Sequence, residues 1–221
     1  MNFKKQNYLV IKNIINKDLA NFLYNYLIIK SNVVFQLKKD NYVANFDEDL
    51  GTFGDVQVND KNSYCCYSDF AMETLLLKIQ SKIEEKIKIK LIPNYTYCRL
   101  YRKGASLPRH KDRYSCGISG TLNLGGDDWP IFIEPDTSEG SIEKEFYVPG
   151  KSKGKKINLK KGDILIYNGV DCEHWREEFM GDKCGQVFLH YQEITEKSLK
   201  NIYDGRPSVG FPISYFKREE V

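Results

Sequence analysis

The segment LPRHKDRYSC, which runs from Leu107 to Cys116, places an imidazole and a carboxylate two residues apart, at His110 and Asp112. Side chains at positions i and i+2 of an extended chain point to the same face, so these two groups can converge on one ion. Two histidines and one carboxylate on one face of a transition metal leave positions open for substrates. A His-x-Asp tripeptide is also common by chance, and an exposed loop with a salt-bridged aspartate explains it equally.

The chain has only two other histidines, His174 and His190. His174 follows the apolar segment GDILIY and a glycine-containing turn, so it can begin a strand that brings a third ligand to His110 and Asp112. His190 lies deep in the last alternating segment, and we interpret it as a packed or hydrogen-bonded structural histidine. The sequence therefore predicts a metal site at His110, Asp112 and His174.

The elements that must position these residues change character near residue 91. Asn16 is a suitable N-cap for a helix in NKDLANFLYNYLII, and a second apolar stripe of helical spacing covers residues 71–90, which Pro93 is expected to end. From about residue 91 the period is two, in short segments separated by glycine, proline and acidic turns. This pattern predicts a mainly β jelly roll with flanking helices. We expect one domain over 1–221, with 1–90 as largely helical N-terminal support and 91–221 as the jelly-roll core and C-terminal tail.

Composition sets limits on the class of protein. The 221 residues are 41% hydrophobic and 29% charged, which is typical of a soluble globular domain. A net charge of +3 gives no strong argument for a nucleic-acid partner. The six cysteines form no C-x-x-C pair, and no apolar run approaches the roughly 18 residues of a membrane span. We expect reduced thiols, a cytoplasmic location and no membrane association.

The order of these motifs resembles the Fe(II)/2-oxoglutarate-dependent oxygenases, with the prolyl-hydroxylase-like branch the most similar. The resemblance rests on HKD, on the strand ending in GDILIY, on the distal histidine, and on a basic residue that opens the next strand. The segments YRKGASLPRHKD, TLNLGGDDWPIFI and KGDILIYNG support it. It covers residues 91–192 and says little about residues 1–90 or about the C-terminal tail.

The resemblance implies a double-stranded β-helix and a specific chemistry. His110, Asp112 and His174 would hold Fe(II), with 2-oxoglutarate and O₂ as cosubstrates and ascorbate as a stimulant. Oxidative decarboxylation of 2-oxoglutarate to succinate would accompany hydroxylation of a protein side chain such as proline, or of a small amino-acid-like molecule. Oxidative demethylation of nucleic acid and a non-catalytic jelly-roll binding protein are the alternatives.

The distal carboxylate of 2-oxoglutarate needs a cation inside the barrel, because an unpaired buried charge is costly. In the family a basic residue opens the strand after the distal histidine, which points to Lys183, with Tyr101 or Thr121 completing the pocket. Each has a plainer interpretation: a surface lysine at a turn, an aromatic packed at the sandwich mouth, and an ordinary strand threonine. Arg99 and Arg176 are the next candidates for the anchor.

Other charged residues bear on the substrate. Arg109 and Arg113 flank the metal pair, and we expect them on a solvated edge. The six lysines between 151 and 161 could attract a nucleic acid or an acidic protein, but nearby acidic residues favour a solvated hairpin. The nucleic-acid demethylating branch has paired arginines after its distal histidine, whereas Arg176 is the only arginine between His174 and Arg206.

Specificity in such folds lies in the loops around the mouth of the barrel. In this chain we expect those loops to be Phe46–Asn62, Pro135–Lys156 and the C-terminal tail.

Overall fold

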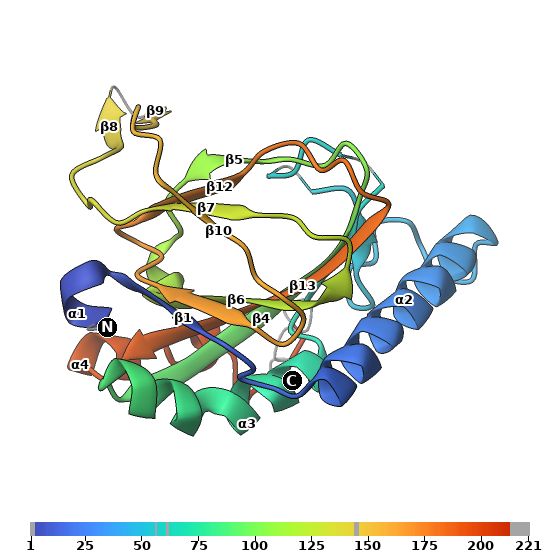
Figure 1. Cartoon of the computed structure of the whole chain (residues 1–221). Coiled ribbons are helices and arrows are strands. Elements are labelled where there is room, and N and C mark those ends of the chain that lie inside the picture. Colours follow the sequence, from blue (N-terminus) through green and yellow to red (C-terminus); the bar gives the residue numbers. More distant parts are fainter. Residues whose placement is uncertain (1–2, 56, 61, 144–145, 213–221) are drawn as a thin grey trace.

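Two antiparallel sheets face one another in the computed structural model, which describes residues 3–55, 57–60, 62–143 and 146–212 (Figure 1). The larger sheet has the strand order β1 (Tyr8–Ile11), β11 (Ile164–Tyr167), β6 (Ile118–Gly126), β13 (Lys183–Glu193), β4 (Leu91–Arg102), β3 (Tyr64–Tyr67) and β2 (Thr52–Phe53). The smaller sheet has the order β10 (Lys155–Ile157), β7 (Ile131–Glu134), β12 (Glu173–Arg176) and β5 (Leu107–His110). A separate hairpin joins β8 (Ser141–Glu143) to β9 (Phe146–Val148). The prediction of a mainly β jelly roll with flanking helices is confirmed.

Two long helices, α2 (Lys17–Lys39) and α3 (Phe70–Ile87), pack on the face of the larger sheet that is turned away from the smaller one (Figure 1). The N-cap at Asn16 is present, since its side chain accepts from the backbone amide of Leu19 at 2.9 Å. The first helix continues well beyond the predicted segment. The second ends at Ile87, because Lys88 adopts the left-handed conformation, with φ of 59°. Pro93 therefore does not end it and lies inside β4.

Short helical turns complete the described chain: α1 (Phe3–Gln6), η1 (Tyr114–Cys116), α4 (Glu196–Leu199) and η2 (Ile202–Gly205). No helix among the described residues is both long enough and apolar enough to cross a membrane.

The N-terminal part of the chain also supplies strands to the larger sheet, which its sequence did not predict. β1 pairs with β11, and β3 pairs with β4. YLVI and YCCY are runs of four residues without alternation, and such runs have no period that distinguishes a buried strand from part of a helix. The expected helical support thus also forms one edge strand and extends the opposite edge of the sheet.

The two faces of the larger sheet differ in chemistry. Its outer face is apolar and forms the main core with the helices, through residues that include Leu23, Leu27, Leu76, Ile79, Leu122, Ile164, Val187 and Leu189. The alternate residues of the same strands face the smaller sheet and are largely aromatic or polar: Tyr95, Tyr97, Arg99, Thr121 and His190. The period of two therefore separates a hydrophobic core from an inner face that can carry a site.

Candidate metal centre

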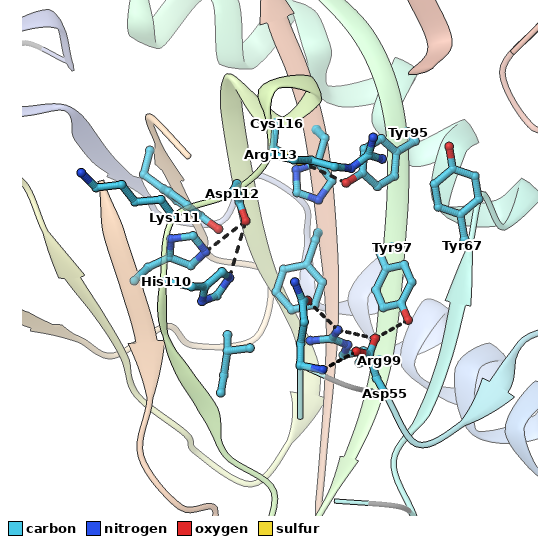
Figure 2. A pocket seen from close by; sticks show the side chains of 16 residues that line it. Asp55, Tyr67, Tyr95, Tyr97, Arg99, His110, Lys111, Asp112, Arg113 and Cys116 are labelled. Atoms are coloured by element: carbon cyan, nitrogen blue, oxygen red, sulfur yellow. Dashed lines mark hydrogen bonds and ion pairs between the residues drawn. The ribbon is translucent and has the colours of Figure 1, made fainter. Parts of the chain in front are cut away.

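A cavity of about 340 Å³ lies between the sheets, and its wall combines the inner face of the larger sheet with strands of the smaller sheet and the loops beside them (Figure 2). It is lined by Asp55, Gln57, Tyr67, Tyr95, Tyr97, Arg99, Leu107, His110, Lys111, Asp112, Arg113, Cys116, Tyr167, His174, Phe188 and His190. All three histidines of the chain and the aspartate of the HKD segment are among them.

His110, Asp112 and His174 come together at one side of this cavity. His110 ends β5 and is the direct cross-strand partner of His174 in β12. The Nε2 atoms of His110 and His174 lie 3.6 and 3.4 Å from the same oxygen, Oδ1 of Asp112 (Figure 2). One possible ligand atom from each residue lies within 4.8 Å of the others, so the three could share a single ion.

Both imidazoles are oriented by backbone carbonyl groups. Nδ1 of His110 lies 2.8 Å from the carbonyl oxygen of Pro108, and Nδ1 of His174 lies 3.2 Å from that of Cys172. A proton on Nδ1 satisfies each contact and leaves Nε2 with its lone pair directed at the Asp112 side. This is the tautomer that a ligating histidine needs.

Asp112 lies beyond the end of β5 and is held by the loop after β11. Its backbone amide donates to the carbonyl of Gly169 at 2.8 Å, and its Oδ2 accepts from the hydroxyl of Ser119 at 2.8 Å. A Cβ at Gly169 would lie 2.5 Å from Oδ2 of Asp112 and 2.6 Å from the Ser119 hydroxyl. Glycine is therefore required there for close approach rather than for an unusual backbone conformation.

The same Ser119 hydroxyl lies 3.0 Å from Nδ1 of His190. Burial lowers the pKa of His190 to about 4, although the Asp112 carboxylate acts in the opposite direction, so the ring is neutral at pH 7. One hydroxyl proton cannot serve two acceptors, and a consistent chain runs from His190 Nδ1–H to Ser119 and from Ser119 to Asp112. The predicted structural, hydrogen-bonded histidine at 190 is thus also a lining residue of the cavity.

A second group, Asp112, Cys116 and His190, also places possible ligand atoms within 4.8 Å of one another. This second group is less suited to a metal, because its possible ligand atoms already make hydrogen bonds within the protein. The sulfur of Cys116 lies 3.0 Å from the hydroxyl of Tyr95, and burial raises the pKa of this thiol, which keeps it protonated. The first group instead directs two imidazole nitrogens and one carboxylate oxygen at a common point.

The electrostatics of the first group favour an ionised carboxylate. Burial alone would raise the pKa of Asp112, but the facing side chains of His174 and His110 hold it well below its ordinary value. A charged carboxylate beside two imidazoles matches the ligand chemistry of a divalent transition metal.

Lys183 is not among the residues that line the cavity. Along β13 the inner positions are even-numbered, with Phe188 and His190 in the cavity wall, whereas Val187 and Leu189 belong to the outer core. Lys183 shares their odd phase, its side chain is 38% exposed, and it pairs with the exposed Asp182 at 3.5 Å. The inward placement expected for Lys183 is therefore wrong. Successive side chains of a strand point to opposite faces of the sheet, and Lys183 points to the outer face.

Arg176 occupies the interior instead. It lies two residues after His174 on β12, and its residue is 2% exposed. Nη1 donates to the carbonyl of Trp129 at 2.5 Å, while Nε and Nη2 are buried without a hydrogen-bond partner among the described residues. Burial lowers the pKa of this guanidinium. The surrounding groups Cys184, Tyr101 and Tyr167 act in the opposite direction.

Tyr101 and Thr121 are both fully buried on the inner face but outside the cavity lining. Tyr101 packs against Trp129, with ring centroids 4.7 Å apart, and its hydroxyl accepts from Arg99 at 3.3 Å. The hydroxyl of Thr121 lies 3.5 Å from Oε1 of Gln186. Their part in binding a cosubstrate stays a prediction.

Arg99 is committed to other partners. Its Nη2 donates to Asp55 at 2.6 Å and to Gln57 at 3.1 Å, and these contacts hold the segment after β2 against the cavity wall (Figure 2). The expected mouth loop Phe46–Asn62 therefore reaches the cavity through Asp55 and Gln57, whereas residues 56 and 61 lie outside the described part.

Of the two arginines that flank the metal pair, Arg113 is exposed as expected, whereas Arg109 is not on a solvated edge. Arg109 is 12% exposed and pairs with the fully buried carboxylate of Glu173 at 2.5 Å, with its guanidinium over the Trp175 ring. Arg113 is half exposed, but it lines the cavity, lies over the Tyr95 ring and pairs with Asp204 at 2.6 Å. The sequence missed these pairs because Glu173 and Asp204 are distant along the chain.

No known family model matches the sequence, and no curated protein matches it. Several solved structures do. The Pseudomonas putida prolyl-4-hydroxylase is 11% identical, with a TM-score of 0.52, over 87% of this chain and 96% of that one. HygX from Streptomyces hygroscopicus, solved with nickel and 2-oxoglutarate bound, is 12% identical, with a TM-score of 0.58, over 86% of this chain and 84% of that one.

A third similar structure is SnoN, a non-heme alpha ketoglutarate dependent epimerase from nogalamycin biosynthesis. It is 10% identical, with a TM-score of 0.60, over 98% of this chain and 93% of that one. At these identities the likeness shows the fold. The chain has the fold of the iron- and 2-oxoglutarate-dependent oxygenases, as the resemblance in sequence implied.

Proposed function

We propose that this protein is an iron- and 2-oxoglutarate-dependent oxygenase. The observation that carries the proposal is the convergence of His110 Nε2, His174 Nε2 and Asp112 Oδ1 at one side of a cavity, within a fold shared with such oxygenases. Neither the fold alone nor the HKD tripeptide alone would suffice, because folds host many functions and short motifs recur by chance.

The donor set fits Fe(II). Two neutral imidazoles and one carboxylate on one face are typical of non-heme iron sites and leave positions free for other ligands. His110, Asp112 and His174 would hold the metal, which supplies the redox chemistry when bound together with 2-oxoglutarate and O₂. The chain's own contribution is to fix the two ring tautomers through Pro108 and Cys172, and to hold Asp112 ionised.

The interior also fits the distal carboxylate of 2-oxoglutarate, and Arg176 is the residue we assign to it in place of Lys183. Two buried guanidinium nitrogens without partners are unfavourable unless an anion meets them. Residues two apart on a strand are roughly 6.5 Å apart along it, a spacing close to the length of a five-carbon diacid that reaches from the metal. A planar guanidinium can bind the carboxylate through two parallel hydrogen bonds, which a lysine cannot do.

The substrate we propose is a protein side chain such as proline or a small amino-acid-like molecule. A cavity of about 340 Å³ has room for one side chain or one small molecule, and Tyr67, Tyr95, Tyr97 and Phe188 provide an apolar wall. HygX has been solved with hygromycin B bound, and another similar structure is EctD from S. alaskensis in its apo form. These names concern those proteins, and here they support only the reaction type.

Succinate formation tests the proposal. Purified protein would be supplied with Fe(II), 2-oxoglutarate, ascorbate and air, together with proline-containing peptides, free amino acids or methylated single-stranded oligonucleotides. We expect stimulation by one of the first two classes, its loss in His174→Ala, and its retention in Lys183→Ala. Stimulation by oligonucleotides alone would favour nucleic-acid demethylation. Absence of succinate in protein that binds both metal and 2-oxoglutarate would favour a binding protein.

A further inference from the structure

Two of the six cysteines face each other across neighbouring strands, away from the metal cavity. Cys66 of β3 is the direct cross-strand partner of Cys98 of β4. Both side chains belong to the outer core, and the Cys98 thiol donates to the backbone carbonyl of Cys66 at 3.6 Å. Directly paired residues of antiparallel strands have Cα atoms about 4.5–5.5 Å apart, which is within the range that a disulfide requires.

A buried ammonium group stands beside this pair. Nζ of Lys30, from α2, donates to the sulfur of Cys66 at 3.4 Å and to Oδ2 of Asp69 at 2.5 Å. The Lys30 side chain is 18% exposed, so its charge is only partly screened by solvent. Asp69 also accepts from the hydroxyl of Tyr26, and it caps α3 through its other oxygen. Lys30 is thus held in place by a structural carboxylate.

A second cavity, of about 560 Å³, gives this corner of the protein an approach from outside. Its lining includes Lys30, Cys66, Asp69 and the neighbouring Cys65. Cys66 itself is 2% exposed and Cys98 is fully buried. A small reagent that enters the cavity therefore meets Cys65 and Cys66, whereas Cys98 lies behind them.

The environment distinguishes Cys66 from the other described thiols. The neighbouring Cys98 thiol lowers the pKa of Cys66 to about 7; burial opposes this shift, Lys30 adds to it, and Asp69 acts against it. Burial raises the pKa of Cys65, the adjacent thiol on the opposite face, and likewise that of Cys116, Cys172 and Cys184. The thiolate is the nucleophilic form of cysteine, so Cys66 is the thiol of this set prepared to react near neutral pH.

We propose that Cys66 and Cys98 form a peroxide-reactive dithiol site, in which Cys66 is the nucleophile and Cys98 the resolving thiol. The Cys66 thiolate attacks one oxygen of hydrogen peroxide, the O–O bond breaks, and hydroxide leaves, which gives Cys66 sulfenic acid. The Cys98 thiol then attacks the Cys66 sulfur, and the sulfenic hydroxyl leaves as water with the thiol proton. Two thiols are oxidised by two electrons and one peroxide is reduced to two waters.

The site lies directly behind the proposed metal cavity. The next residue on β3 is Tyr67 and the preceding residue on β4 is Tyr97, and both line that cavity from the opposite face of the sheet. The disulfide would therefore link two strands at the point where they present these tyrosines. The proposal does not depend on the oxygenase function, because it uses a different face of the sheet and different residues.

The test is a peroxide titration of the reduced full-length protein with a chelator present, so that no metal chemistry contributes. Free thiols would be blocked afterwards, and linked peptides identified by mass spectrometry. We expect a Cys66–Cys98 cross-link, with a mass loss of about two hydrogens, before any other cysteine is modified. Cys65→Ser, on the same strand, should leave the cross-link unchanged. Oxidation of other thiols while Cys66 and Cys98 remain free would overturn the proposal.

Lys30 provides a second measurement that does not need the disulfide. In Lys30→Met the rate of Cys66 alkylation by iodoacetamide at pH 7 should fall about fivefold, because the thiolate fraction decreases when a neighbouring cation is removed. Lys86→Met, on an exposed surface of α3, is the control and should leave the rate unchanged. If Lys30→Met is poorly folded by circular dichroism, the pH profile of alkylation in the unaltered protein decides. A midpoint near 7 supports the site, and one above about 8.5, the value of an ordinary thiol, contradicts it.

Discussion

His110 and His174 are directly opposed residues of two neighbouring strands, with ring centroids 4.3 Å apart. This pairing alone places two imidazoles side by side. The loop that follows His110 then brings Asp112 to them. Two of the three proposed ligands are therefore positioned by regular sheet structure, which is more rigid than a loop.

Metal affinity should depend on all three proposed ligands. In His110→Ala, His174→Ala and Asp112→Ala we expect Co(II) or Mn(II) to bind at least about 100-fold more weakly, since loss of supporting partners alone costs ten- to a hundredfold. Titration calorimetry and the Co(II) visible spectrum measure this directly. Lys183→Ala, which removes a surface charge, should bind metal as the unaltered protein does. Tight Co(II) binding in His174→Ala would instead point to the group of Asp112, Cys116 and His190.

Arg176 should matter for 2-oxoglutarate and not for the fold. Arg176→Met should weaken 2-oxoglutarate binding about 100-fold, the usual scale when one partner of a buried charge pair is removed. Without 2-oxoglutarate its melting temperature should equal or exceed that of the unaltered protein, because a buried and incompletely paired cation is itself destabilising. Thermal shift with and without the cosubstrate separates the two effects. Lys183→Ala should retain affinity; the opposite pattern would restore Lys183 as the anchor.

Ser119 should support the metal site through Asp112. Ser119→Ala removes the hydrogen bond to Oδ2 and breaks the chain to His190, so we expect metal affinity to fall about tenfold. Ser141→Ala, at an exposed position of β8, serves as the control. The readout is metal affinity at constant pH, together with the Co(II) spectrum, which should shift if the carboxylate reorients. An unchanged spectrum and affinity would leave Ser119 with a purely structural role.

Gly169 should tolerate no side chain. In Gly169→Ala the new methyl group would displace either the Asp112 carboxylate or the Ser119 hydroxyl, so we expect metal affinity to fall at least about tenfold. Gly117→Ala is a matched control on the neighbouring segment, where the nearest atom to a new Cβ lies 3.7 Å away. Normal metal binding in Gly169→Ala would show that the loop relaxes without moving its carboxylate neighbour.

The buried pair Arg109–Glu173 should make stability depend on pH in a defined direction. Burial by itself would raise the pKa of Glu173, but Arg109, Tyr147 and the backbone amide of Gly150 together bring it below its ordinary value. A carboxyl with a depressed pKa stabilises the fold fully above its unfolded value of about 4.3, and this contribution is lost as the pH falls through the folded pKa.

Arg109→Met should therefore destabilise the protein by roughly 3 kcal/mol at pH 7, because it leaves a buried carboxylate without its cation. The difference from the unaltered protein should shrink below about pH 4, where Glu173 becomes protonated in both. Urea unfolding between pH 3 and 8 measures this. Lys160→Met, which breaks an exposed pair with Asp128, should change stability by less than about 1 kcal/mol. A difference that grows toward low pH would contradict the assignment.

The sequence predicted a jelly-roll core from about residue 91 onward because the inner and outer faces of the strands there alternate cleanly. It also predicted which three residues meet. For Asp112, however, strand alternation is only part of the physical cause. β5 ends at His110, and the contact with Gly169, rather than strand alternation alone, turns Asp112 toward the histidines. The glycine was visible in YNG, but nothing in the sequence shows which carboxylate it approaches.

The phase of β13 was the main feature that sequence reasoning could not fix. β13 pairs with β4 without a break from Lys183 to His190, so Lys183 keeps the outward phase of Val187 and Leu189. The family position of a basic residue at the start of this strand suggested Lys183, whereas the structure places Arg176 in the interior. Long-range ion pairs such as Arg109–Glu173 could not be predicted either, because a single sequence carries no information on which distant charges meet.

The pairing of β1 with β11 has a consequence for synthesis of the chain. Lys12 and Asp163, which flank that pairing and form an ion pair, are 151 positions apart. At about 5–20 residues per second, a ribosome completes β11 roughly ten to thirty seconds after β1 has been made. Until then the first strand has no partner, and the edge of β6 that receives β11 stays open to pairing with other chains. The loop after β11 also holds Asp112 through Gly169. A nascent chain stalled before residue 163 would therefore lack both this support and the strand that covers β6, and it would present an aggregation-prone sheet edge.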